Sequence, residues 1–251
     1  MAQRYRLFVH AGLEEGNIIR CEPAQAHYLL TVLRLKAGAT VGIFNGIDGE
    51  WEGELHLTGR KSASIEAKCK IRDQGTLADI MYLFAPLKRA RLDYMVQKAT
   101  EMGVSVLQPV ITQYTNVYRL KMERLKLNAI EAAEQCNLLS IPEVREPMNL
   151  EQVLAGWPRH RCLIYCDERA DKECAIERLK KIDSGPVAVL IGPEGGFSQA
   201  ENEALRSLPF VVPISLGPRI MRADTAAVAA LALVQATLGD WSRATPNIPE
   251  R

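Results

Sequence analysis

Alternation of apolar and polar residues dominates the N-terminal part of the chain. It is clearest in residues 51–57 and 63–71, where a period of two predicts β-strands with one buried face. Residues 40–44 form another strand-like run, and residues 45–49, Asn-Gly-Ile-Asp-Gly, have the chemistry of a hairpin turn. One helix, with Pro23 in its first turn, interrupts these strands. We therefore expect a small β-barrel or curled sheet, a common way to present a nucleic-acid-binding surface.

The pattern changes near residues 73–76, beyond which strands alternate with helices. Apolar runs typical of buried strands cover residues 80–85, 104–110, 162–166 and 187–191. Helical periodicity predicts helices over residues 92–102, 122–139 and 224–238. This alternation is typical of a parallel α/β sheet, so we predict two domains, residues 1–74 and 75–251.

The last two strand–helix units carry glycine-bearing loops. Residues 192–197, Gly-Pro-Glu-Gly-Gly-Phe, follow a buried strand and lead into a helix whose start is marked by a capping box at residues 198–201. The second loop, residues 216–223, follows the short strand 211–215, and Pro213 predicts that this strand lies near the margin of the sheet. We expect the two loops to form one ligand site at the carboxyl ends of the strands.

The first loop has the composition of a backbone turn that fits closely around a ligand. Gly192, Gly195 and Gly196 let the backbone approach a flat ligand without interference from a Cβ atom. Glu194 is able to accept hydrogen bonds from ribose hydroxyls or to orient arginines. The chain has no G-x-x-x-x-G-K-[ST] motif, and no G-x-G-x-x-G opens its first α/β unit, which excludes the usual nucleotide sites. A plain strand-to-helix turn is the alternative explanation.

Arg219 and Arg222 precede the last predicted helix. Their charge opposes the positive end of the helix dipole, a cost that is offset if an anion binds between them. Pairing with Glu194 or Asp224 is an equally good explanation, and Asp224 is also a candidate N-cap of the helix.

Of the 251 residues, 47% are hydrophobic and 24% are charged, as in globular proteins, and the formal net charge is only +1. This charge argues against a uniform positive field that coats nucleic acid, although local basic pairs can still converge on one face. No apolar run approaches the ~20 residues of a membrane span, and no secretory signal is evident, so we expect a cytoplasmic protein. The six cysteines include no C-x-x-C pair, and we expect no metal site.

Two motifs resemble those of a known family. G-P-E-G-G-F-S-x-x-E at residues 192–201 and L-G-x-R-I-M-R-x-D-T-A at residues 216–226 are similar to motifs of the RsmE family of SPOUT methyltransferases, which methylate N3 of a uridine in bacterial 16S ribosomal RNA. Further similar segments occur in the expected order at residues 4–9, 27–34, 97–104 and 129–136. One departure is Asn-Leu-Leu-Ser at residues 137–140, where the family commonly has Gly-Arg-Asn-Arg. Basic contacts to RNA are therefore expected to be missing there.

The resemblance implies an α/β protein with a SPOUT-type, trefoil-knotted methyltransferase domain over residues 75–251. A small PUA-like β-barrel domain that binds RNA would precede it, over residues 1–74. The resemblance also implies a homodimer, S-adenosylmethionine as the cofactor, and 16S ribosomal RNA or the small ribosomal subunit as the partner.

The resemblance also suggests roles for individual residues. The cofactor would be held by Gly192, Pro193, Glu194, Gly195, Gly196, Leu216, Gly217, Ile220, Met221, Thr225 and Ala226. Arg222 is the first choice for holding the target nucleotide or stabilising the uracil anion, with Arg219 as its helper. Glu194 and Asp224 are the candidate proton acceptors. Contacts to RNA are expected from Arg4, Arg6, Arg34, Lys36, Lys88 and Arg89.

Two other classes of protein fit the same residues. A ribosome-assembly protein with this fold would bind RNA without catalysis. A nucleotide-dependent enzyme acting on a small molecule would bind an adenosine ligand and show no salt-dependent affinity for RNA.

Overall fold

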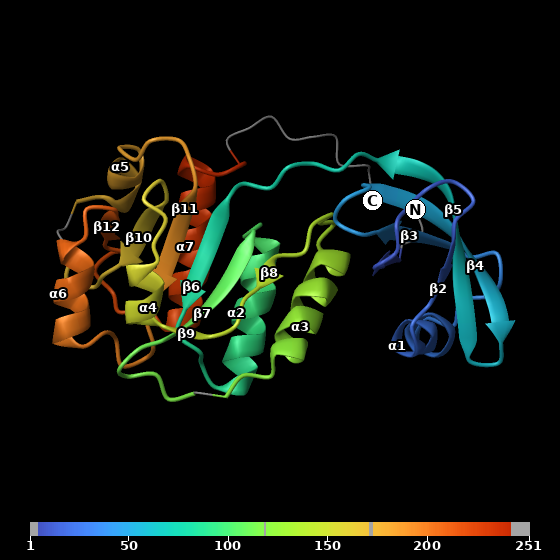
Figure 1. Cartoon of the computed structure of the whole chain (residues 1–251), viewed down its shortest axis with the longest axis horizontal. Coiled ribbons are helices and arrows are strands. Elements are labelled where there is room, and N and C mark those ends of the chain that lie inside the picture. Colours follow the sequence, from blue (N-terminus) through green and yellow to red (C-terminus); the bar gives the residue numbers. More distant parts are fainter. Residues whose placement is uncertain (1–4, 118, 171–172, 242–251) are drawn as a thin grey trace. The chain divides into compact units, whose positions relative to one another are not determined.

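The computed structural model describes residues 5–117, 119–170 and 173–241 (Figure 1). Within these ranges the chain forms two compact units. Unit 1 contains residues 5–76 and 133–141, and unit 2 contains residues 77–132 and the described residues from 142 onward. Residues 133–141 thus belong to unit 1 although the chain on both sides of them belongs to unit 2.

Unit 1 is built on a five-stranded sheet with the order β1-β3-β4-β5-β2. The strands are β1 (Arg6–Phe8), β2 (Ile18–Arg20), β3 (Thr40–Phe44), β4 (Glu50–Gly59) and β5 (Ser62–Arg72). β4 and β5 form a long antiparallel pair, in which Leu55 and Ile65 are buried while Glu54 and Glu66 are half-buried. The alternation predicted from the sequence is therefore confirmed, because every second side chain of a strand faces the core.

The turn between β3 and β4 has the predicted hairpin chemistry. Oδ1 of Asn45 accepts hydrogen bonds from the backbone N–H groups of Ile47 (3.0 Å) and Asp48 (2.8 Å). Gly46 and Gly49 have φ angles of +84° and +85°, which L side chains rarely adopt. The asparagine and the glycines together close the hairpin.

The helix predicted in unit 1 is present, and only its first part is α-helical. It begins at Pro23 as α1 (Pro23–His27) and continues as the π-helical segment η1 (Tyr28–Val32). Arg34, just beyond it, has a φ angle of +55°, a value uncommon for a residue other than glycine. Apolar spacing alone does not distinguish a π-turn from an α-turn.

Arg6 of β1 forms a buried ion pair with Glu50 of β4 and also binds backbone carbonyl groups of residues 133–138. Nε of Arg6 donates to Oε1 of Glu50 at 2.7 Å, and Nη2 of Arg72 lies 2.9 Å from Oε2 of the same carboxylate. The two Nη atoms of Arg6 donate to the carbonyl oxygens of Ala133 (2.8 Å), Glu134 (3.1 Å) and Leu138 (2.7 Å). Arg6 thus binds carbonyl groups in the last turn of the helix α3 (Met122–Gln135) and in the segment just beyond it.

Unit 2 contains a parallel sheet with the order β12-β10-β11-β6-β7-β8, and β9 pairs with β7 beside it. The strands are β6 (Ile80–Phe84), β7 (Val106–Ile111), β8 (Glu143–Val144), β9 (Met148–Asn149), β10 (Cys162–Cys166), β11 (Val187–Ile191) and β12 (Val211–Ile214). All residues of β6 and β11 are buried, as the continuous apolar runs predict. β12 lies at the edge of the sheet, which confirms the prediction drawn from Pro213.

Helices connect these strands (Figure 1). Besides α3, they are α2 (Arg89–Glu101), α4 (Leu150–Ala155), α5 (Ala175–Leu179), α6 (Gln199–Ser207) and α7 (Ala223–Thr237). α3 ends four residues before the predicted end at Leu139, and α7 begins one residue before the predicted start at Asp224. Among the described residues, no helix has both the length and the hydropathy needed to cross a membrane.

Candidate active site

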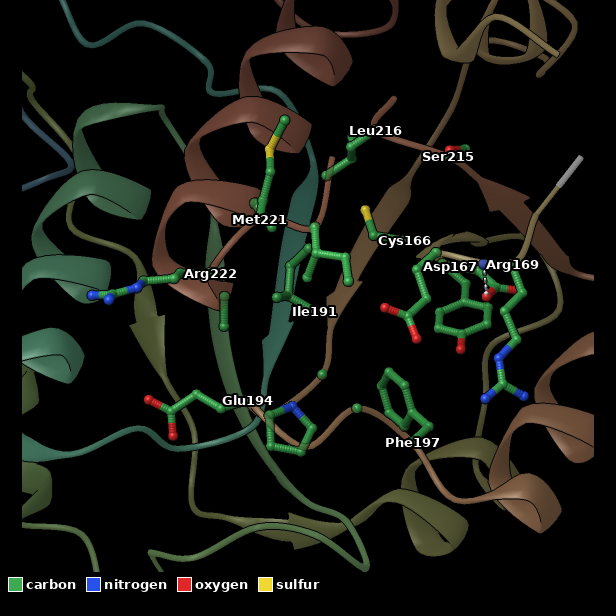
Figure 2. Close-up of a pocket in the computed structure, with 18 of the residues that line it drawn as sticks. Cys166, Asp167, Arg169, Ile191, Glu194, Phe197, Ser215, Leu216, Met221 and Arg222 are labelled. Atoms are coloured by element: carbon green, nitrogen blue, oxygen red, sulfur yellow. Dashed lines mark hydrogen bonds between the residues drawn. The ribbon is translucent and has the colours of Figure 1, made fainter. Parts of the chain in front are cut away.

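Three neighbouring strands of unit 2 end beside one cavity. Because β12, β10 and β11 are parallel, the loops that follow Ile214, Cys166 and Ile191 leave the same edge of the sheet. These loops line a cavity of about 350 Å³ (Figure 2). A cavity of this size at the carboxyl ends of parallel strands is typical of ligand-binding sites in α/β proteins.

The loop after β11 is held by its own backbone and by the helix that follows. The N–H group of Gly196, whose φ angle is +69°, donates to the carbonyl oxygen of Pro193 at 2.9 Å. Ser198 accepts a hydrogen bond from the N–H group of Glu201 at 3.2 Å, and the Glu201 side chain accepts one from the N–H group of Ser198 at 2.8 Å. The predicted capping box is therefore confirmed, and it fixes the point at which the loop becomes α6.

Gly192 has no room for a side chain. A Cβ atom at this position would lie 2.6 Å from Cε2 of Phe197. The Phe197 ring in turn packs edge-on against the ring of Tyr165, with centroids 5.2 Å apart, and the Tyr165 hydroxyl donates to Asn202. Gly192 is thus required by the aromatic packing of Phe197 and Tyr165, which themselves line the cavity.

The loop after β12 leaves a large apolar side chain uncovered. Ile220 is 88% exposed although it lines the cavity, and Gly217 has a φ angle of +105°. Arg222 is the N-cap residue of α7, and its side chain makes no capping hydrogen bond. The prediction that Asp224 caps this helix is therefore wrong: Asp224 lies within the first turn, because the helix begins one residue earlier.

The structure brings most of the predicted site residues together. Those that line the cavity are Gly192, Pro193, Glu194, Gly195, Gly196, Leu216, Gly217, Arg219, Ile220, Met221, Arg222 and Ala226. Thr225 and Asp224, which follow in the first turn of α7, are not among the lining residues.

Glu194 has a partner that the sequence did not indicate. Its Oε1 accepts a hydrogen bond from Arg91 in the first turn of α2, and neither Arg219 nor Arg222 forms this ion pair. Both side chains of the pair are about one-third exposed. In Figure 2, Glu194 and Arg222 extend to one side of the view, while Asp167 and Arg169 lie on the other. Glu194 therefore connects the first loop to α2.

The loop after β10 also lines the cavity, and the sequence analysis missed it. Asp167 is buried, accepting hydrogen bonds from Nε of Arg206 and from the backbone N–H group of Arg169, both at 2.9 Å. The charged run Asp167 to Arg169 directly after an apolar strand was the available signal. Strand order in the sheet is a tertiary property, so the position of β10 between β11 and β12 could not be read from chain order.

Cys166 at the end of β10 has an unreactive thiol. It lines the cavity, and burial raises the pKa of its thiol to about 12. The thiol is therefore protonated at neutral pH, and a protonated thiol is a poor nucleophile.

The predicted RNA contacts have different environments. Arg34 and Lys36 are exposed in unit 1, and Lys88 and Arg89 are exposed in unit 2. The side chain of Arg6 is only 6% exposed and its guanidinium is bonded within unit 1, so the expectation that Arg6 contacts RNA is wrong. Its basic neighbour Arg4 lies outside the described residues.

Comparison with known proteins identifies two matching families. The family described as "RNA methyltransferase domain" matches residues 74–235, and the family described as "RNA methyltransferase PUA domain" matches residues 22–68. A ribosomal RNA small subunit methyltransferase E from Rickettsia conorii is 30% identical over 92% of this chain and 94% of its own length. Its counterpart from Synechocystis is 30% identical over 93% of this chain and 78% of its own length.

Two solved structures have similar folds. The putative methyltransferase of Legionella pneumophila, in complex with its bound cofactor SAM, has a TM-score of 0.85 and 28% identity, covering 95% of this chain and 100% of that one. The ribosomal RNA small subunit methyltransferase E of Neisseria gonorrhoeae, bound to S-adenosyl methionine, has a TM-score of 0.85 and 25% identity with the same coverage. The resemblance inferred from the two loop motifs is confirmed. The chain belongs to the RNA methyltransferase family whose curated members are named ribosomal RNA small subunit methyltransferase E.

Proposed function

We propose that this protein transfers a methyl group from S-adenosylmethionine to N3 of a uridine in the 16S ribosomal RNA of the small subunit. The observation that carries the proposal is the cavity at the edge of the parallel sheet, which both family motifs line. Two solved structures with similar folds hold S-adenosylmethionine.

The residues around the cavity fit this cofactor. S-adenosylmethionine combines a flat adenine, a ribose and a charged amino-acid portion, and needs both apolar surfaces and backbone hydrogen-bonding groups. Leu216, Ile220 and Met221 offer apolar surface, and the high exposure of Ile220 is explained if the adenine covers it. The glycine-rich loop after β11 exposes backbone groups for hydrogen bonding to the ligand. Of the predicted cofactor residues, Thr225 has the weakest support because it does not line the cavity.

The bound cofactor supplies an electrophilic methyl group, and the chain must orient the uracil and remove the N3 proton. We assign Arg222 to hold the target nucleotide and stabilise the uracil anion, with Arg219 as its helper, because both line the cavity. Glu194 is the better of the two candidate proton acceptors, because it lines the cavity while Asp224 does not. A general base contributes ~10²–10⁴-fold to the rate, and orientation contributes ~7–11 kcal/mol.

The state of Cys166 argues against methylation of a pyrimidine carbon through this cysteine. Methylation of a pyrimidine carbon commonly requires a nucleophile that first adds to the ring. Since burial raises the pKa of Cys166 to about 12, the cysteine in this cavity does not provide a thiolate at neutral pH. A nitrogen that has lost its proton needs no such covalent activation.

The remaining parts of the proposal concern the partner and the assembly. We expect Arg34 and Lys36 in unit 1, and Lys88 and Arg89 in unit 2, to contact phosphates of the RNA, because all four are exposed cations. A match to an RNA methyltransferase PUA domain supports binding of RNA by unit 1. We further propose that the protein is a homodimer and acts in the cytoplasm, where ribosomal subunits mature.

Mapping of modified nucleosides tests the proposal. Mass spectrometry of 16S ribosomal RNA from a strain lacking the gene should show the loss of one N3-methyluridine, and the wild-type gene should restore it. The Arg222→Ala gene should not restore it, although calorimetry should still detect binding of S-adenosylmethionine by the variant. An unchanged set of modified nucleosides would instead favour a ribosome-assembly protein without catalysis.

A further inference from the structure

An exposed aromatic side chain stands beside the glycine-rich loop. Tyr114, which follows β7, is 45% exposed. Its Cβ atom lies 3.3 Å from the position that a Cβ of Gly195 would occupy, and its ring atoms Cγ and Cδ2 lie 3.8 and 3.9 Å from that position. Tyr114 therefore contacts the loop after β11, and a side chain at residue 195 would press on it.

The turn that carries Tyr114 is anchored on both sides. Thr112 and Thr115 are buried, and Oγ1 of Thr115 accepts a hydrogen bond from the N–H group of Thr112 at 2.9 Å. The N–H group of Gln113 donates to Oε1 of Glu201 at 2.8 Å, and Glu201 belongs to the capping box of α6. Tyr114 is thus an exposed ring on a fixed backbone, and binding to such a ring costs little conformational entropy.

Exposed cations lie on the segment that leaves the same end of the sheet as the turn of Tyr114, because β6 and β7 pair in parallel. β6 lies between β11 and β7 in the sheet, and the segment after β6 contains the exposed Lys88 and Arg89. Arg91, one turn further, forms the ion pair with Glu194. Proteins bind unpaired nucleotides by combining an accessible aromatic ring with cations on nearby segments, because the base stacks on the ring while the cations meet the phosphates.

Tyr114 contacts Gly195 but is not among the residues that line the cavity. A base stacked on this ring would therefore lie beside the target nucleotide and not inside the cavity. We propose that Tyr114 is the stacking platform for an unpaired RNA base adjacent to the methylated uridine. This assignment deepens the proposed function and rests on it.

The test combines three substitutions with two separate measurements. Tyr114→Ala removes the ring, Tyr114→Phe keeps it without the hydroxyl, and Tyr94→Ala removes a tyrosine of nearly equal exposure, 44%, from α2 as a matched control. RNA binding is measured by fluorescence anisotropy with short single-stranded RNAs that span the mapped uridine. Steady-state methylation of undermethylated small subunits gives KM and kcat, and calorimetry gives the affinity for S-adenosylmethionine.

Loss of one stacked base weakens RNA binding by about 5- to 150-fold, since such stacking contributes ~1–3 kcal/mol. We expect Tyr114→Ala to raise the RNA Kd and KM within this range, and to leave kcat and the cofactor affinity unchanged. Tyr114→Phe and Tyr94→Ala should resemble the wild type.

Three outcomes would overturn the assignment. The first is an unchanged RNA Kd and KM in Tyr114→Ala. The second is an equal loss in Tyr114→Phe, which would indicate a hydrogen bond of the hydroxyl. The third is a parallel loss of cofactor affinity, which would indicate that Tyr114 only supports Gly195. The proposed function fails differently, through absence of methyl transfer or of cofactor binding in the wild type, whereas the RNA Kd values still report on Tyr114.

Discussion

A single methyl group at Gly192 should disturb the proposed cofactor site by displacing Phe197, a residue of the cavity wall. In Gly192→Ala the new Cβ atom would lie 2.6 Å from Cε2, 3.0 Å from Cδ2 and 3.1 Å from Cζ of Phe197. Carbon atoms in good contact are ~3.5–4.0 Å apart, so the ring must withdraw by about 1 Å. It cannot do so freely, because it packs against Tyr165. The φ angle of Gly192 is not positive, so the substitution acts through sterics and not through backbone strain.

Overpacking of this kind costs about 1–3 kcal/mol. Thermal unfolding should therefore show a lower Tm, by about 2–4 °C per kcal/mol for a protein of this size. Titration calorimetry should show weaker binding of S-adenosylmethionine, because Gly192 and Phe197 both line the cavity. Gly185→Ala is the matched control, since a Cβ there has no atom within 4 Å and the φ angle is not positive.

A double-mutant cycle isolates the contact between the two residues. Phe197→Leu removes the ring atoms that the new methyl group would meet. In the Phe197→Leu background, Gly192→Ala should lower the free energy of unfolding by less than about 0.5 kcal/mol, a difference no larger than the scatter between independent substitutions. The reasoning is refuted if Gly192→Ala has the same cost in both backgrounds, or if it changes neither Tm nor cofactor affinity in the wild type.

Four further predictions address other parts of the molecule. Arg222→Ala should abolish methylation while cofactor binding and Tm stay near wild-type values, because the side chain makes no capping bond to α7; a normal turnover number would remove Arg222 from the mechanism. Arg6→Met should destabilise the protein by about 3–5 kcal/mol in denaturant unfolding, because it leaves Glu50 buried with one partner fewer. The control Arg20→Met, at an exposed strand position, should be close to neutral. Ser198→Ala should cost ~0.5–2 kcal/mol through loss of the capping box, and equal unfolding midpoints would contradict the role given to that box. The hydrogen bond from Arg124 lowers the pKa of Asp93. The carboxylate therefore stabilises the folded state at pH values above its ordinary pKa, and this contribution is lost as the pH falls through the lowered pKa. Asp93→Asn should flatten the acid branch of a curve of stability against pH, and an unchanged curve would count against the pair.

Local patterns predicted the elements around the site. The apolar runs predicted β10 and β11, and Pro213 predicted the edge position of β12, because these features depend on neighbours in the chain. The capping box at Ser198 was also correct, because its two hydrogen bonds join residues three positions apart. The trefoil knot and the homodimer stay predictions.

Charge patterns were a poorer guide. The pair Arg4/Arg6 looks like an exposed basic cluster in the sequence, yet Arg6 is buried against carbonyl groups of residues 133–138. Residues 137–140, which differ from the common family sequence, also form contacts within the chain. Asn137 adopts a φ angle of +64°, which asparagine tolerates better than most residues, and its carbonyl oxygen accepts a hydrogen bond from Arg72. Side-chain burial depends on segments far apart in the chain, which no local pattern reports.

The sequence by itself determined the two loops that flank the cavity, since glycines, a capping residue and an arginine before a helix act over a few neighbouring positions. Only the tertiary structure decided which loops meet, because the order of strands in the sheet inserts β10 between β11 and β12 and brings Cys166 and Asp167 to the site. Tertiary structure also decided that Glu194 pairs with Arg91 and that Tyr114 stands beside Gly195. These contacts depend on the packing of strands and helices distant in the chain. No sequence pattern around the residues that make them indicates which residue each will contact.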